Sequence, residues 1–378
     1  MLFRSILLIS VLSFSMQKHF HFNQNHSFTI LQITDLHYGE SETADAGNQK
    51  NVRFFIENIK PDVVVVTGDL VSGYAWDMED PTFYQSHWAN FSQVFNETQT
   101  YYAYALGNHD HQGNFNREQI AKLDMTSPYS LMNASKELDW ASTYNVPIFS
   151  SYNKSALATN LWLFDSGDQY MLDLSWGKIT ADQMTWFKSK AHELREQYRE
   201  IPHSMAFFHI PLPEFMDVWN DQPVFGEKYE DVCCPLFDHG TVFDQFVQEG
   251  VSGVFCGHDH NNYYGGWNRG IELVYGRKSG YGSYGPPENV TRGARVITLK
   301  EKFDLKTNKI IIERDHYIFD ENGEVILNGP SFIRSYQQQN MCSPSFDFSK
   351  LLPILDFLEP IIIVGLIYLI WRLLRGIL

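Results

Sequence analysis

Residues 62–69 read DVVVVTGD, an uninterrupted valine run with a glycine and an aspartate directly after it. Four consecutive valines are typical of a strand that is buried on both faces of a sheet. Gly68 permits a tight turn, and Asp69 then projects beyond the end of the strand. Taken alone, Asp69 is better explained as a turn residue or a helix N-cap.

Four other short blocks carry side chains that bind metals well, and most of the five blocks follow an apolar run that predicts a strand. The four are Asp35-Leu36-His37, Gly107-Asn108-His109-Asp110, Phe208-His209-Ile210 and Gly257-His258-Asp259-His260. Metal ligands are commonly placed on loops that a rigid scaffold holds at strand ends. Together the blocks supply carboxylates, a carboxamide and several imidazoles, and they indicate a hydrolase with two adjacent metal ions.

Spacing within the blocks supports this interpretation. Asp35 and His37 are two residues apart, so in an extended strand end both reach one cation. His258 and His260 repeat that spacing after a glycine, which packing alone explains poorly. A lone histidine such as His209 is more often structural, and it is predicted as a ligand only together with the other blocks.

The block at residues 107–110 is the most specific. Asn108 offers a carbonyl oxygen, His109 an imidazole, and Asp110 a carboxylate that would orient a neighbouring imidazole. A turn explains Gly107-Asn108 but not the flanking His-Asp pair. We therefore predict His109 and Asp110 as catalytic residues.

The surrounding pattern predicts a layered α/β domain with two sheets. Strands are expected at 27–34, 62–67, 101–106, 160–165, 204–209 and 253–256, and helices at 48–59, 81–95, 180–198 and 242–248. Thr180 and Gln183 form a predicted capping box. Strands at 271–275, 294–299 and 309–315 follow. One catalytic domain is expected over residues 27–335.

The two ends of the chain predict targeting. Arg4 precedes an apolar stretch, so residues 1–16 are predicted as a signal peptide, with an N-terminal strand as the alternative. Residues 336–352 are predicted as a connector and 353–375 as a C-terminal apolar helix that spans the membrane. Arg372 and Arg375 near the end of this helix indicate that the end faces the cytosol, since positive residues flank membrane spans on that side. The catalytic domain is then expected in the lumen or outside the cell. A lipid anchor or an amphipathic surface helix are the alternatives.

Charge limits the expected partners. The 378-residue chain has a formal net charge of -16 and no basic block, so a nucleic-acid partner is not expected. Six Asn-X-Ser/Thr triplets predict glycosylation in the secretory pathway. They begin at Asn25, Asn90, Asn96, Asn133, Asn153 and Asn289.

The four cysteines leave several pairings open. In an oxidising compartment Cys233, Cys234, Cys256 and Cys342 allow two disulfides with three connectivities. A bridge between Cys233 and Cys234 would be strained, and Cys256 is also explained as a small buried apolar residue. The cysteines lack the paired spacing of a structural zinc site.

The ordered set of blocks resembles the calcineurin-like metallophosphoesterase superfamily, over most of residues 31–299. Within it the chain is most similar to the purple-acid-phosphatase-like branch of plant and fungal proteins. The segments that carry this closer likeness are residues 106–110, 163–167, 211–214, 256–261, 280–285 and 292–296. The resemblance implies an α/β/β/α sandwich with two mixed β-sheets.

The resemblance also implies the metal ligands, residue by residue. The first metal would take Asp35, His37 and His260; the second would take Asn108, His209 and His258; and Asp69 would bridge them. Oxygen and imidazole ligands suit Mn, Fe or Zn, and the sequence does not choose among these.

One position departs from the purple enzymes. They carry a tyrosine ligand three residues after the second aspartate, where this chain has Ser72, with Tyr74 two residues further on. They also have glycine where this chain has His37. We therefore expect an uncoloured centre in which His37 takes the coordinating role of the tyrosine.

The function implied is a phosphomonoester phosphatase. In it a metal-bridging hydroxide attacks phosphorus and His109 assists the leaving group. Arg277, in a Gly- and Tyr-rich stretch at residues 275–285, is predicted to bind substrate, although a plain hairpin loop explains that stretch equally well. The substrate would be a phosphorylated small molecule or a phosphoprotein. The alternatives are a phosphodiesterase of nucleotides or phospholipid headgroups, and an inactive, membrane-tethered binding protein.

Overall fold

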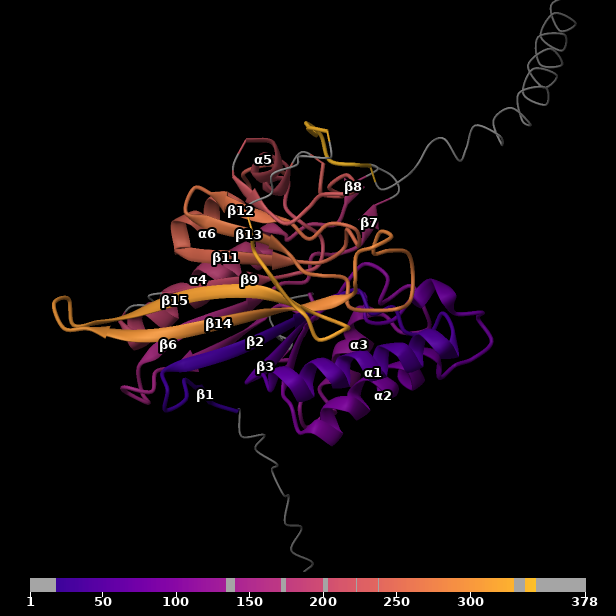
Figure 1. Cartoon of the computed structure of the whole chain (residues 1–378), viewed down its shortest axis with the longest axis horizontal. Helices are drawn as coiled ribbons and strands as arrows, with labels where there is room; N and C mark the ends of the chain where they lie inside the picture. Colours follow the sequence, from indigo (N-terminus) through magenta and orange to yellow (C-terminus); the bar gives the residue numbers. More distant parts are fainter. Residues whose placement is uncertain are drawn as a thin grey trace, which may run out of the picture.

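The computed structural model describes residues 18–133, 140–170, 175–199, 203–221, 223–236, 238–329 and 337–344. Two mixed β-sheets form its centre, and helices cover their outer faces (Figure 1). The predicted signal peptide and the predicted apolar helix at 353–375 lie outside the described residues. Among the helices that are described, none has the length and apolar character needed to cross a bilayer.

The six-stranded sheet contains the valine run. Its order is β16 (Val325–Leu327), β15 (Lys309–Asp320), β14 (Gly293–Asp304), β2 (Ser27–Ile33), β3 (Val63–Thr67) and β4 (Tyr102–Ala105). β2, β3 and β4 run parallel, while β14 to β16 add antiparallel strands. Every residue of β3 is buried, as the four valines predict. The sheet is therefore mixed.

The eight-stranded sheet packs against the first one. Its order is β1 (Phe20–His21), β5 (Tyr144–Phe149), β6 (Leu157–Leu163), β9 (Ser204–Phe207), β11 (Val251–Cys256), β13 (Ile271–Tyr275), β12 (Gly265–Asn268) and β10 (Val224–Phe225). β6, β9, β11 and β13 run parallel. A separate pair, β7 (Gln169–Tyr170) and β8 (Ser175–Trp176), lies beside the sandwich.

Two hydrophobic clusters define the layers. One joins both faces of the six-stranded sheet to the inner face of the larger sheet and includes the buried faces of α1 (Glu42–Ile59) and α2 (Phe83–Thr98). The other packs the outer face of the larger sheet against α4 (Ala181–Tyr198), α5 (Glu214–Asp221) and α6 (Phe243–Glu249). α3 (Arg117–Asp124) and the 3₁₀ turn η1 (Gly73–Ala75) complete the set. The predicted α/β/β/α sandwich with two mixed sheets is confirmed.

Several boundaries differ from the sequence prediction. α1 begins at Glu42 rather than at residue 48, because Ser41 caps it and its first turns are polar and show no apolar period. The capping box at Thr180 and Gln183 is confirmed at the start of α4. β14 and β15 are 12 residues each, longer than predicted.

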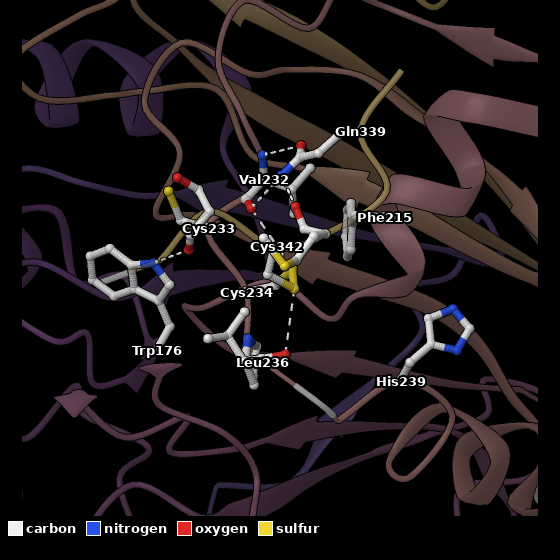
Figure 2. The surroundings of a disulfide bond; sticks show 12 residues. Trp176, Phe215, Val232, Cys233, Cys234, Leu236, His239, Gln339 and Cys342 are labelled. Carbon is white, nitrogen blue, oxygen red and sulfur yellow. Dashed lines mark hydrogen bonds between the residues drawn. A yellow bond between two sulfur atoms is a disulfide. The ribbon is translucent and has the colours of Figure 1, made fainter. Parts of the chain in front are cut away.

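A disulfide joins Cys234 to Cys342 across 108 residues and leaves Cys233 and Cys256 free (Figure 2). Gln339 strengthens the attachment, since its Oε1 accepts from the Val232 N–H at 2.7 Å and its Nε2 donates to the Val232 carbonyl at 3.0 Å. Residues 337–344 of the predicted connector therefore lie against the domain. Disulfides persist in oxidising compartments, and placement of the chain in the secretory pathway stays a prediction.

The predicted glycosylation positions are accessible. Asn25, Asn96, Asn133, Asn153 and Asn289 are exposed, and Asn90 is half-buried. Their modification stays a prediction.

Because the Cys234–Cys342 bridge closes a long loop, removing it should destabilise the domain. We expect Cys234→Ser/Cys342→Ser to lower the free energy of unfolding by about 2–5 kcal/mol. Denaturant titration measures this, with Cys233→Ser as the control that keeps the bridge. Equal unfolding midpoints for the double variant and the wild type would contradict the assignment.

Candidate metal centre

Five loops converge where the parallel strands of the two sheets end. Asp35, His37, Asp69, Asn108 and His109 follow β2, β3 and β4 of the smaller sheet, in that order. His209 follows β9, and His258 and His260 follow β11, its neighbour in the larger sheet. Since the carboxyl ends of neighbouring parallel strands share one sheet edge, side chains far apart in sequence meet there.

The backbone at this edge is strained at several of the ligand positions. Asp35, His37, Asp69 and His258 have φ angles of 54°, 56°, 50° and 77°. A left-handed conformation costs a residue with a Cβ atom roughly 1–2 kcal/mol. Strain of this kind accumulates at functional sites, where the surrounding structure enforces it.

Two glycines allow the loops to approach one another. At Gly68, whose φ is +90°, an added Cβ atom would lie 2.4 Å from Nδ1 of His209. At Gly257 it would lie 2.0 Å from Oγ1 of Thr34. The glycines that precede Asp69 and His258 are therefore required by close packing across the two sheets.

The predicted ligands of the first metal are brought together. One possible ligand atom from each of Asp35, His37, Asp69 and His260 lies within 4.8 Å of the others. Nε2 of His37 is 3.1 Å from Nε2 of His260 and 3.6 Å from Oδ2 of Asp69. Nε2 of His260 is 3.4 Å from Oδ1 of Asp35.

The predicted ligands of the second metal adjoin this group and share Asp69 with it. Asp69, His209 and His258 form a second set with ligand atoms within 4.8 Å. Nε2 of His209 is 3.1 Å from Oδ2 of Asp69, 3.0 Å from Oδ1 of Asn108 and 3.2 Å from Nδ1 of His258. All seven predicted ligands thus lie in one cluster, with Asp69 between its halves.

Hydrogen bonds on the outer side of the imidazoles fix which nitrogen faces inward. Nδ1–H of His209 donates to the Thr67 carbonyl at 2.7 Å, and Nδ1–H of His260 donates to the Tyr284 carbonyl at 2.9 Å. In neutral rings the Nε2 lone pairs then face the carboxylate and carbonyl oxygens of the cluster. Lone pairs that face one another repel unless a cation lies between them, so these residues fit a pair of bound metal ions.

Burial keeps most of the imidazoles neutral. It is the main cause that lowers the pKa of His37, His258 and His260 below the usual histidine range. Burial also opposes a charge on His209, but the charge of Asp69 and a hydrogen bond with it raise the pKa of His209 to about 9. For Asp69, burial raises the pKa, but the neighbouring His209 and His109 hold it well below its usual range.

His109 lies at the edge of the cluster and is half-buried. Its backbone N–H donates to Oδ1 of Asp69 at 2.9 Å, and its Nδ1 contacts Oε1 of Gln112 at 2.8 Å. The ring centroid is 5.6 Å from that of His37 and 4.8 Å from that of Tyr74. Donation from Nδ1–H to Gln112 leaves Nε2 available for a substrate.

The expected role of Asp110 as the partner of the His109 imidazole needs correction. Asp110 is fully buried, and its carboxylate accepts hydrogen bonds from the backbone N–H groups of Asp69, Val71 and Gly107 at 3.1, 3.0 and 2.7 Å. A carboxylate that satisfies three backbone donors fixes the loop that carries Asp69. Gln112 makes the contact with the imidazole, and no motif marked it.

Ser72, at the position of the purple-enzyme tyrosine, supports His37 from outside. Its Oγ lies 2.8 Å from Nδ1 of His37 and donates to Oε1 of Glu40 at 2.6 Å. The hydroxyl of Tyr74 donates to the same Glu40 oxygen. The tyrosine position therefore supplies a hydrogen-bonding partner of the imidazole.

Arg277 contacts other groups of the protein, and its role in substrate binding stays a prediction. It is buried, donates from Nε to the Thr291 carbonyl at 2.7 Å and places its guanidinium 4.1 Å from the ring centroid of Tyr263. Its neighbour Lys278 reaches the cluster instead, with Nζ 3.0 Å from the Asp35 carbonyl oxygen. Burial lowers the pKa of Lys278 to about 8.

Two aromatic rings pack against imidazoles that are predicted metal ligands. The Trp176 ring centroid is 4.4 Å from that of His258, and the Tyr284 centroid is 4.2 Å from that of His260. Tyr284 belongs to the Gly- and Tyr-rich stretch predicted for the substrate cleft. Trp176, in β8, belongs to no motif of the sequence.

Comparisons with known proteins agree with this geometry. The calcineurin-like phosphoesterase family matches residues 28–262, which contain all seven predicted ligands. A protein named probable inactive purple acid phosphatase 29, from Arabidopsis thaliana, is 30% identical over 313 residues, 74% of this chain and 78% of its own length. Phosphatase DCR2 of Saccharomyces cerevisiae is 28% identical over 63% of this chain and 44% of its own length.

The fold is shared with a solved dimetal phosphatase from Danio rerio. The TM-score is 0.52 at 13% identity, and the match covers 80% of this chain and 99% of the other. An identity this low shows the fold alone, whereas the family match spans more than half of the chain. The chain belongs to the calcineurin-like phosphoesterase family.

Proposed function

We propose that the chain hydrolyses phosphomonoesters with the help of two metal ions. The observation that carries this proposal is the Asp69 carboxylate, which two groups of ligand atoms share. Two bound ions of the Mn, Fe or Zn type would hold phosphate oxygens and lower the pKa of the attacking water. The other ligands, Asp35, His37, Asn108, His209, His258 and His260, surround that carboxylate.

His109 serves the leaving group in this proposal. It sits beside both halves of the cluster, since its backbone is bonded to Asp69 and its ring lies against that of His37. Gln112 holds Nδ1 and turns Nε2 outward. A proton on Nε2 can pass to the departing alkoxide oxygen. This transfer neutralises the negative charge that develops on the leaving group of a monoester.

A binding protein without catalysis is the alternative of another class. The words "probable inactive" stand in the name of the Arabidopsis relative and describe that protein. This chain retains every predicted ligand and His109 in one cluster, which supports activity. A protein that only binds its ligand would not need an imidazole oriented by Gln112, as His109 is.

Loss of the shared carboxylate should remove both metal and activity. We expect Asp69→Asn to hold fewer than the two metal ions per chain of the wild type. Turnover of p-nitrophenyl phosphate should fall roughly 100- to 10,000-fold, the effect of losing several kcal/mol of metal-assisted stabilisation. Elemental analysis and initial rates measure this, with the exposed Asp182→Asn as the matched control. Full metal content with unchanged turnover in Asp69→Asn would refute the proposed centre.

His109 and Gln112 should affect turnover more than metal content. We expect His109→Ala to lower kcat roughly 100- to 10,000-fold for a substrate with a poor leaving group, as loss of a general acid does. Gln112→Ala should cost roughly 10- to 100-fold, as the loss of an orienting partner does. The exposed His192→Ala controls for removal of an imidazole. If the loss for His109→Ala is the same with p-nitrophenyl phosphate, a good leaving group, then proton donation is the wrong role.

Paired substrates separate the monoesterase from a phosphodiesterase. We expect kcat/KM for p-nitrophenyl phosphate to exceed that for bis-p-nitrophenyl phosphate, because a dianionic phosphate gains more from two cations than a monoanionic one. The same preparation and metal are used for both assays. A preference for the diester would replace the monoesterase by the phosphodiesterase that the same cluster also suits.

A further inference from the structure

Beside the binuclear cluster lies a third group of ligand atoms, of which the proposed phosphoesterase mechanism uses only His258. The sulfur of Cys233, a carboxylate oxygen of Asp259 and a ring nitrogen of His258 lie within 4.8 Å of one another. Cys233 is a free thiol, and the residue is half-buried. Figure 2 shows its sulfur directed away from the neighbouring disulfide.

The group is held in place on each side. The Cys233 N–H donates to the two carboxylate oxygens of Asp259 at 3.3 and 3.2 Å, and the Tyr275 hydroxyl donates to Oδ2 at 2.6 Å. The next residue, Cys234, is fixed by its bridge to Cys342. A carboxylate has about four acceptor positions, so Asp259 retains capacity for a further partner.

His258 supplies an independent observation that points to a ligand. Its Nδ1 faces the binuclear cluster, 3.2 Å from Nε2 of His209. Its Nε2 is buried and has no hydrogen-bond partner among the described residues, and the side chain is only 7% exposed. A buried ring nitrogen without a partner is costly, and a bound ion would satisfy it.

The donor set decides the kind of ion. Thiolate, imidazole and carboxylate together suit Zn²⁺ and its softer analogue Cd²⁺, whereas Mg²⁺ and Ca²⁺ prefer oxygen. Three protein ligands leave one position of a tetrahedral ion open to water, which makes the ion exchangeable. Binding would release the thiol proton of Cys233 to solvent.

We propose that Cys233, His258 and Asp259 form a third metal site for a thiophilic divalent ion, and that an ion bound there inhibits the binuclear centre through the shared His258. While Nδ1 ligates the second metal, the single ring proton of neutral His258 is on Nε2; an ion that binds Nε2 moves this proton to Nδ1, which then cannot ligate the second metal. The inhibition, although not the binding, rests on the proposed phosphoesterase function.

The test titrates the full chain, already loaded with Mn²⁺, with Cd²⁺ alone. We expect ultraviolet thiolate-to-Cd²⁺ charge-transfer absorption that saturates at one ion per chain, together with a progressive loss of p-nitrophenyl phosphate turnover. Cys233→Ser should lose the absorption and require roughly 10- to 100-fold more Cd²⁺ for the same inhibition. Cys256→Ala removes the other free thiol and should keep both responses. Circular dichroism confirms that each variant is folded.

A second measurement uses the wild-type chain, so it remains decisive if Cys233→Ser fails to fold. Cd²⁺ should slow alkylation of Cys233 by iodoacetamide, measured by mass spectrometry of the peptide that contains it. The same alkylation rate with and without Cd²⁺, or equal absorption in Cys233→Ser and wild type, would overturn the site. A chain without turnover before Cd²⁺ is added would refute the phosphoesterase proposal, while the absorption and alkylation results would still decide the third site.

Discussion

The carboxylate of Asp69 is the group on which the two halves of the molecule depend. It follows the buried valine strand of one sheet, yet its Oδ2 lies 3.1 Å from Nε2 of His209, at the end of a strand in the other sheet. Asp110 satisfies the backbone around it, and Gly68 lets His209 approach. Such a carboxylate stays charged in a buried place only because imidazoles, and in the proposed enzyme metal ions, surround it.

The fold and the ligands could be predicted because they depend on short local patterns. The valine run predicted β3, and Thr180 with Gln183 predicted the start of α4; the structure confirms both. The start of α1 was missed because Ser41 determines it while its first turns are polar. Local spacing carries this kind of information for single elements, and the common edge of parallel strands then brings the blocks together.

The supporting residues could not be predicted, because their roles depend on contacts between distant loops. Asp110 follows His109 directly, but its carboxylate accepts hydrogen bonds from the backbone of another loop. Gln112 is the residue that contacts the His109 imidazole. Arg277 and Lys278 are neighbours, yet only the lysine reaches Asp35. Sequence order distinguishes neither pair, since which side chain turns inward is decided by packing.

The attachment of residues 337–344 has a mechanical consequence. The Ser343 carbonyl accepts a hydrogen bond from Nε1 of Trp176 at 3.0 Å, and the Trp176 ring rests against His258. A single indole thus separates this segment from an imidazole of the metal cluster. Ser343 lies on the C-terminal side of Cys342, so tension applied beyond residue 344 would load the hydrogen bond between Ser343 and Trp176 before it reaches the Cys234–Cys342 bond. Such a pull would act on the indole that packs against His258, while the disulfide keeps the residues before Cys342 in place.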